Sequence, residues 1–104
     1  MRERLGYATV AVLGAVKQGH RYGLDIMRLT GLPSGTVYPT LTRAERSGLV
    51  RSRWEDRAAA DHAARPRRRH YQLTAAGEAA LAKAIERWNA LTSPVRRLRA
   101  KART

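Results

Sequence analysis

The apolar residues near the start of the chain recur at helical spacing and predict a first helix over residues 3–18. Its apolar stripe is formed by Leu5, Ala8, Val12 and Val16. Gly19 follows this stripe as a stop signal. A second apolar group over residues 22–29 predicts a helix of about two turns, because Gly31 and Pro33 follow it closely.

A third helix is predicted from Ser34 to about Ser47, with one apolar and one polar face. Ser34 should be its N-cap, since the hydroxyl can accept a hydrogen bond from a backbone N–H in the first turn, and Gly48 should be a left-handed cap at its end. Pro39 is expected to bend this helix rather than end it. The core stripe consists of Val37, Leu41 and Ala44, and the outward face of Gly35, Thr36, Pro39, Thr42, Arg43 and Arg46.

Two short strands are predicted over residues 49–54 and 70–73, because apolar residues alternate there with basic or polar ones. The basic segment that joins them, residues 55–69, is called the wing below. We expect it to be a long loop, and its alanines could instead form a turn of helix. Trp54 and Tyr71 are expected to lie in the core of the hairpin.

A last helix is predicted to start after Thr74, which should cap it. Its apolar positions are three or four residues apart, which is typical of a helix that packs against another helix. This seam consists of Leu81, Ile85, Trp88, Leu91, Val95 and Leu98. The stripe could cover the domain's own core instead, but it continues beyond what a small domain can cover, so we expect a homodimer. Ser93 and Pro94 are typical of a new helix start, so we expect a kink or restart there.

In this order the elements are typical of a winged helix-turn-helix, a mainly α fold with a small β-hairpin wing, followed here by a C-terminal dimerisation helix. The chain of 104 residues suffices for one structural unit. We divide it into a winged helix-turn-helix over residues 1–73 and a dimerisation helix with a basic tail over residues 74–104. Such a module places one helix against DNA.

The charge of the chain favours a polyanionic partner. Lys and Arg number 21 against 8 Asp and Glu, a net charge of +13 that attracts DNA, RNA or an acidic membrane surface. The absence of cysteine excludes disulfides and thiolate chemistry and suits the cytoplasm. No apolar stretch is long enough to span a bilayer and no targeting segment is apparent, so we expect a cytoplasmic protein without a membrane partner.

Residues for metal binding or catalysis do not come together in the sequence. His20, His62 and His70 are scattered, with no second ligand at the spacing that a metal-binding helix face needs. The carboxylates show no paired acid and base, and neither a nucleotide-binding loop nor a nucleophile elbow occurs. We therefore expect no metal, no cofactor and no enzymatic activity.

Several short motifs carry a family resemblance over residues 5–91. They are Tyr22-Gly23, Gly35-Thr36-Val37-Tyr38-Pro39, Gly48-Leu49-Val50, Trp54-Glu55 and Arg67-Arg68-Arg69-His70-Tyr71-Gln72-Leu73-Thr74-Ala75-Ala76-Gly77. In this order they resemble the PadR family of bacterial transcriptional regulators. The two longest motifs, at the third helix and at the second strand, are the most specific.

The resemblance implies a dimeric repressor whose C-terminal helix pairs with its counterpart and with the first helix. It also implies a small planar aromatic inducer, stacked between Trp88 and its symmetry mate at the dimer centre. The chain departs from the family pattern in its wing, which lacks a glycine-rich tip, and at Pro94. Residues 89–92 contain no carboxylate, so a preference for cationic drugs is unsupported.

Base contacts are expected from the outward face of the third helix. Arg43 is the candidate for guanine, because its fork matches the two acceptors that this base shows in the major groove. Thr36 and Thr40 should reach other base edges, and Pro39 should touch a base or a sugar.

Phosphate contacts are expected on both sides of these base contacts. Ser34 and Tyr38 would hold phosphates, although Tyr38 could equally be a core aromatic with its hydroxyl at the surface. In the wing, Arg65, Arg67 and Arg68 would meet the backbone or an adjacent minor groove, unless they form a solvated basic loop.

A protein-interaction module without sequence-specific DNA binding is the alternative function. It predicts fewer small polar groups on the third helix and less clustering of arginine at the wing. The sequence instead has several small polar groups on the third helix and clustered arginines at the wing, which favours DNA.

Overall fold

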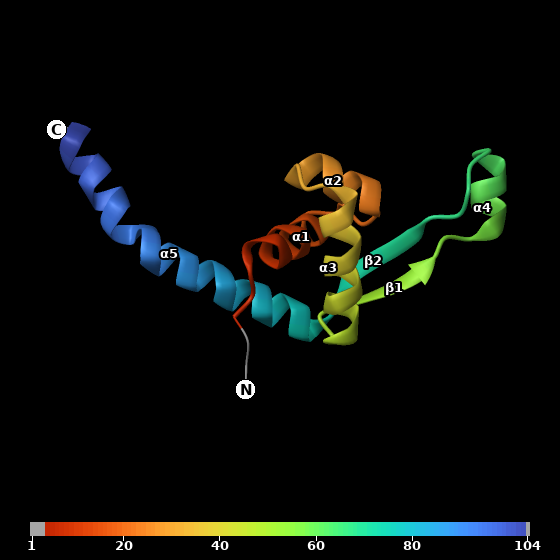
Figure 1. Cartoon of the computed structure of the whole chain (residues 1–104), viewed down its shortest axis with the longest axis horizontal. Helices are drawn as coiled ribbons and strands as arrows, with labels where there is room; N and C mark the ends of the chain where they lie inside the picture. Colours follow the sequence, from red (N-terminus) through yellow and green to blue (C-terminus); the bar gives the residue numbers. More distant parts are fainter. Residues whose placement is uncertain (1–3, 104) are drawn as a thin grey trace.

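Over residues 4–103, the part of the chain that this computed structural model describes, there are five helices and one two-stranded antiparallel sheet. From residue 95 onward Leu98 is the one described side chain. The elements are α1 (Tyr7–Lys17), α2 (Gly23–Thr30), α3 (Ser34–Arg46), β1 (Val50–Trp54), α4 (Arg57–His62), β2 (Arg69–Leu73) and α5 (Ala75–Arg103) (Figure 1). The expected winged helix-turn-helix is confirmed.

The core lies where α1, α2 and α3 meet the inner ends of the hairpin and of α5. Its fully or almost fully buried members are Val12, Leu13, Ala15, Val16, Ile26, Val37, Leu41, Ala44, Val50 and Leu81. Burying an aliphatic side chain of this size contributes about 1.5–3 kcal/mol, so this cluster is the main stabilising term. The expected helix bounds of 3–18 are wrong, because Gly6 is an extended N-cap and half-buried Leu5 packs on the core from outside the helix.

The start of α3 differs from the prediction by one residue. Pro33 is the N-cap and Ser34 is the first helical residue, without a side-chain cap bond. The carbonyl oxygen of Pro33 accepts hydrogen bonds from the N–H groups of Thr36 and Val37, at 2.9 and 3.0 Å. Proline suits this position, since its backbone is already extended and needs no donor. At the other end, Gly48 is left-handed with φ +76°, as predicted.

Both internal prolines lie inside continuous helices. Pro39 is the sixth residue of α3, which continues to Arg46. A kink or a restart was predicted at Pro94, and the restart is wrong, because α5 runs without a break from Ala75 to Arg103. In each case the ring removes a single backbone donor, which the rest of a long helix tolerates.

The strands pair in one register, with Val50 opposite Leu73, Ser52 opposite Tyr71 and Trp54 opposite Arg69. The loop between α1 and α2 joins the free edge of β2, where the Tyr71 N–H donates to the Arg21 carbonyl oxygen at 2.9 Å. Tyr71 is buried as predicted. The turn of helix that the wing alanines allowed is present as α4, and Ala60 is its buried residue.

Thr74 joins α5 to the end of α3. Its hydroxyl accepts from the Gly77 N–H at 3.0 Å, which confirms the predicted cap, and donates to the Gly48 carbonyl at 2.5 Å. Its own N–H donates to the Leu49 carbonyl at 3.0 Å. A Cβ on Gly77 would lie 2.9 Å from the Leu49 carbonyl carbon, so this close approach requires glycine. A rotation of α5 would therefore shift the backbone at the end of α3.

Beyond its first turns α5 leaves the rest of the chain (Figure 1). The molecule measures 58 × 35 × 23 Å along its principal axes, and the long dimension runs from the end of α5 to α4 at the tip of the wing. The wing and the far end of α5 thus lie at opposite ends of the molecule (Figure 1).

Candidate nucleic-acid interface

Helix α3 has one buried and one exposed face. Val37, Thr40, Leu41 and Ala44 are buried, as their spacing of three and four residues requires. The opposite side, called the polar face of α3 below, consists of Gly35, Thr36, Tyr38, Pro39, Thr42, Arg43 and Arg46. All of these are exposed except Thr36, which is half-buried. Ser34 is exposed at the start of the helix.

The expected surface position of Thr40 is wrong. Its side chain is 1 % exposed, because it falls on the core stripe between Val37 and Ala44. Its hydroxyl accepts a hydrogen bond from Arg43 Nη2 at 3.3 Å. Thr40 therefore orients the guanidinium of Arg43 and does not itself face a partner.

Tyr38 is half-exposed and packs against the first residue of α2. A Cβ on Gly23 would lie 2.6 Å from Tyr38 Cζ, so the ring lies directly on the glycine backbone. Its backbone carbonyl accepts from the Thr42 hydroxyl at 3.0 Å. The ring is thus neither a core residue nor free, and its hydroxyl lies beside the N-terminus of α2.

Glu55 holds the wing closed at its base. Arg65 binds both oxygens of its carboxylate, and Arg68 donates to the same group from Nη2 and from its backbone N–H, both at 3.3 Å. The Glu55 carbonyl oxygen accepts from Arg67 Nε at 2.8 Å. The hydrogen bonds from Arg65 are the largest cause that lowers the pKa of Glu55 to about 2, so this carboxylate is charged throughout the physiological range.

This arrangement changes the roles predicted for the wing arginines. Arg65 is half-buried and its guanidinium is paired with the Glu55 carboxylate, so it stabilises the closed wing. Arg67 and Arg68 are exposed. Arg68 also lies on the ring of Tyr22, with its Cζ 3.8 Å from the ring centroid, where a guanidinium is held by cation–π attraction.

The other face of the hairpin carries a second basic group around His70. The imidazole meets the ring of Tyr22 edge-on, with the centroids 5.5 Å apart. Burial first, and then the charges of Arg53 and Arg21, lower the pKa of His70. The imidazole is therefore neutral at pH 7, and the positive charge of this face comes from arginine.

The sequence analysis assigned no DNA contact to two exposed arginines, although it placed one of them, Arg46, on the outward face of the third helix, and it misplaced Trp54. Arg46 is exposed on α3, and Arg69 is exposed on β2. Trp54 was expected in the hairpin core, but its side chain is 52 % exposed. The signal was available in the strand alternation, which puts Val50, Ser52 and Trp54 on one face, and the hairpin extends away from α3 toward the third of them (Figure 1).

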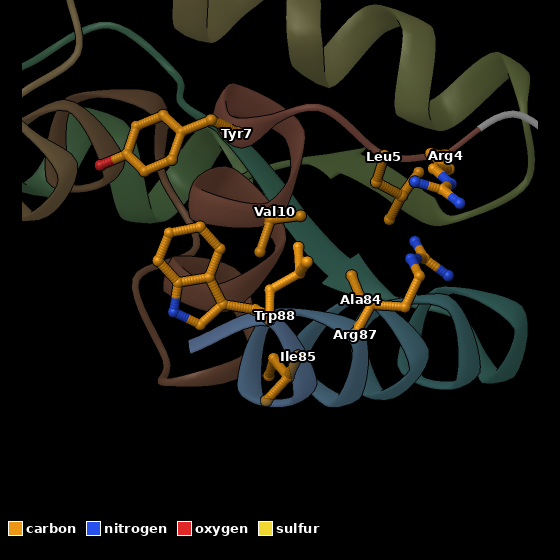
Figure 2. A pocket seen from close by; sticks show the side chains of 9 residues that line it. Arg4, Leu5, Tyr7, Val10, Ala84, Ile85, Arg87 and Trp88 are labelled. Carbon is orange, nitrogen blue, oxygen red and sulfur yellow. The ribbon is translucent and has the colours of Figure 1, made fainter. Parts of the chain in front are cut away.

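A largely apolar groove of about 520 Å³ lies between the N-terminal segment, α1 and α5 (Figure 2). Its lining residues are Arg4, Leu5, Tyr7, Val10, Ala84, Ile85, Arg87, Trp88 and Leu91. Trp88 is 62 % and Leu91 73 % exposed, whereas Leu81 is buried in the chain's own core, which corrects its place on the predicted seam. Val95, also expected on the seam, lies outside the described side chains.

The described residues form neither a metal site nor a membrane-spanning helix. Within residues 4–103 no group of three potential ligand side chains could hold a metal ion. No helix in this part of the chain is both long and apolar enough to cross a bilayer.

Known proteins share this fold. A crystal structure of a PadR family transcription regulator from Clostridium difficile matches with a TM-score of 0.77 and 22% identity, over 89% of this chain and 98% of that one. BpsR of Bordetella bronchiseptica, whose DNA binding is regulated by 6-hydroxynicotinic acid, matches with a TM-score of 0.70 and 20% identity, over 88% and 64%. The M. tuberculosis regulator MOSR in complex with DNA matches with a TM-score of 0.69 and 23% identity, over 94% and 71%.

At such identities the likeness establishes the fold alone. No curated protein sequence gives a significant match. The model of the transcriptional regulator PadR-like family, however, matches residues 12–83, which span α1 to the first part of α5. Together with the winged-helix fold, this match shows that the chain belongs to the PadR-like family of transcriptional regulators, and not to a family of enzymes.

Proposed function

We propose that the protein is a homodimeric repressor that binds double-stranded DNA with sequence specificity through α3 and the wing. The polar face of α3 is the observation that carries this proposal. Small side chains there allow close approach to base edges, and no described acidic side chain pairs with Arg43 or Arg46. Unpaired guanidinium groups on an exposed helix are suited to base edges and phosphates.

The contacts divide by chemistry. Arg43, oriented by Thr40, is proposed to read guanine, with Thr36 and Pro39 close to neighbouring bases. Ser34 and Tyr38 are proposed to hold phosphates at the start of α3.

The wing supports this binding without reading sequence. Hydrogen bonds to Glu55 hold Arg67 and Arg68 in place in the wing. We propose that both contact the sugar-phosphate backbone. Because Glu55 already neutralises Arg65, that residue contributes to the shape of the wing rather than to its free charge.

The dimer is proposed to form through α5 and α1. Ile85, Trp88 and Leu91 are exposed on α5, and they line one groove together with Tyr7 and Val10 of α1. A contiguous apolar surface of this kind is typical of an interface. A two-fold axis here would present two α3 helices to half-sites one helical turn, about 10 bp, apart or a multiple of it.

Trp88 is proposed to bind a planar aromatic inducer where it meets its symmetry mate. An indole on an otherwise apolar groove offers stacking and burial to a flat molecule. Arg4 and Arg87 line the same groove and none of its described lining residues is acidic, so their charge favours an uncharged or anionic compound over a cationic one. The inducer would lower DNA affinity only as far as it favours a non-binding arrangement of the two units.

Titration of labelled duplex DNA with the protein, combined with sedimentation of the free protein, tests this function. We expect a dimer at tens of micromolar and duplex binding that weakens steeply with salt. A monomer, or the absence of duplex binding at low salt, would contradict the proposal. A planar aromatic compound should quench Trp88 in a Trp54→Phe background, and quenching that survives an added Trp88→Ala would exclude the inducer site.

A further inference from the structure

Trp54 lies exposed beside two guanidinium groups that other residues hold in place. We propose that its indole packs against a deoxyribose of the DNA backbone, while Arg67 and Arg69 meet the phosphates on either side. This inference rests on the proposed function and adds a base-independent apolar contact to it. Trp54, Arg67 and Arg69 are called the Trp54 cluster below.

The geometry of the Trp54 cluster is that of a ring flanked by cations. The Cζ atoms of Arg69 and Arg67 lie 5.3 and 5.8 Å from the centroid of the indole. Both are within the distance at which a ring face attracts a guanidinium. The indole nevertheless stays 52 % exposed, so the arginines flank it without covering it.

Other residues hold both arginines in place. Arg67 Nε donates to the Glu55 carbonyl oxygen at 2.8 Å, and Arg69 Nε donates to Ser52 Oγ at 2.9 Å. Arg69 Nη2 also lies 3.7 Å from Glu45 Oε1 of α3. Because these side chains are already ordered, binding through them costs less conformational entropy than binding through free arginines.

The Trp54 cluster lies on the side of the hairpin that faces α3. Side chains two apart on a strand point to the same face, so Trp54 shares its face with Ser52. Ser52 Oγ donates to Glu45 Oε2 of α3 at 2.7 Å, which fixes that face toward the recognition helix. DNA bound along α3 would thus find the Trp54 cluster beside the groove.

The chemistry of the DNA backbone is complementary to this cluster. A sugar presents apolar C–H groups between two phosphates, and the Trp54 cluster presents an apolar ring between two cations. Contacts with the backbone position a protein without reading sequence. The indole should therefore add affinity equally for every duplex.

Trp54→Ala, Trp54→Phe and the wild type, each titrated into a random-sequence duplex of roughly two helical turns, test the inference. Leu24→Ala is the matched control, since Leu24 is equally exposed, at 52 %, but lies on α2. We expect Trp54→Ala to weaken binding roughly five- to thirty-fold, and Trp54→Phe and Leu24→Ala to bind nearly as the wild type does. In a Trp88→Phe background, the duplex should also protect Trp54 from quenching by neutral acrylamide.

The salt dependence separates a contact from a supporting role. The indole is uncharged, so Trp54→Ala should leave the slope of log K against log salt unchanged. A flatter slope would mean that Trp54 merely positions the two arginines, and would overturn the inference, as would unchanged affinity. Greater loss on single-stranded than on duplex DNA would assign the ring to unstacked bases instead. A wild type that binds no duplex would overturn the proposed function together with this inference.

Discussion

The winged-helix unit and the exposed half of α5 place their apolar residues in opposite ways. In the first, Leu13, Ile26 and Leu41 are fully buried, and the exposed surface of α3 and the wing is polar and basic. In the second, Trp88 and Leu91 project from a helix that leaves the core behind. The first region has a complete core within one chain, and its surface is suited to a polyanion. The second has an apolar surface that the described part of this chain leaves exposed.

The largest effect should come from charging the apolar surface of α5. Ile85→Glu should give a monomer with its helices intact, because Ile85 is already 45 % exposed and the charge is buried only when two copies meet. Losing the second recognition helix should cost on the order of 100-fold or more in affinity for a two-fold symmetric site. Sedimentation and DNA titration measure both effects.

Ala90→Glu is the matched control for Ile85→Glu. Ala90 is exposed on α5, and its position in the helix repeat puts it on the side away from Ile85. The Ala90→Glu variant should remain dimeric and bind DNA as the wild type does. If Ile85→Glu remained dimeric like Ala90→Glu, the contrast between the two regions would be wrong, because the apolar surface of α5 would then have no partner.

The next effect should come from the polar face of α3. Arg43→Ala should cost about 1–3 kcal/mol on a specific site and leave random DNA nearly unaffected, because a guanine contact is lost. Lys83→Ala removes the same charge from an exposed position on α5 and should change neither. Equal losses on specific and random DNA for Arg43→Ala would refute its base-reading role.

A smaller and less selective loss is expected at the wing. Replacing Arg67 and Arg68 together by alanine should weaken specific and random DNA alike. It should also flatten the salt slope by roughly one to two, because each phosphate contact contributes about 0.9 to that slope. A loss confined to one sequence would mean that the wing reads bases.

The smallest effect concerns the base of the wing and its pH dependence. The folded pKa of Glu55, about 2, lies below its ordinary value of 4.5. The stabilisation by Glu55 is therefore fully present above pH 4.5 and is lost as the pH falls toward 2. Denaturant unfolding should show Glu55→Gln less stable than the wild type at pH 7, with the difference shrinking below pH 4.5. A difference that is independent of pH would exclude the ion pairs as its cause.

The local sequence pattern predicted much of the fold. The residues that were misplaced depend on features that a local pattern does not include. Spacing predicted the burial of Val12 and Val16 in α1 and the buried face of α3, and residue type predicted the caps at Gly48 and Thr74. Thr40 was misplaced because its chemistry suggested a base contact, whereas its position in the helix repeat buries it. Helical spacing outweighed residue type at this position.

The remaining differences depend on contacts between distant segments. Arg65 is ten residues from Glu55, and only the closed wing brings their charges together. Trp54 is exposed because the outer part of the hairpin extends away from α3 (Figure 1). The uninterrupted α5 shows that a single Pro94 does not end a helix of 29 residues.

Sequencing the duplex fragments that the purified protein retains from a random pool at moderate salt tests the central claim most directly. A dimer with two α3 helices predicts an enriched inverted repeat whose half-site centres are about 10 bp, or a multiple of it, apart. Retained fragments without a shared motif, or with one unpaired half-site, would contradict the account.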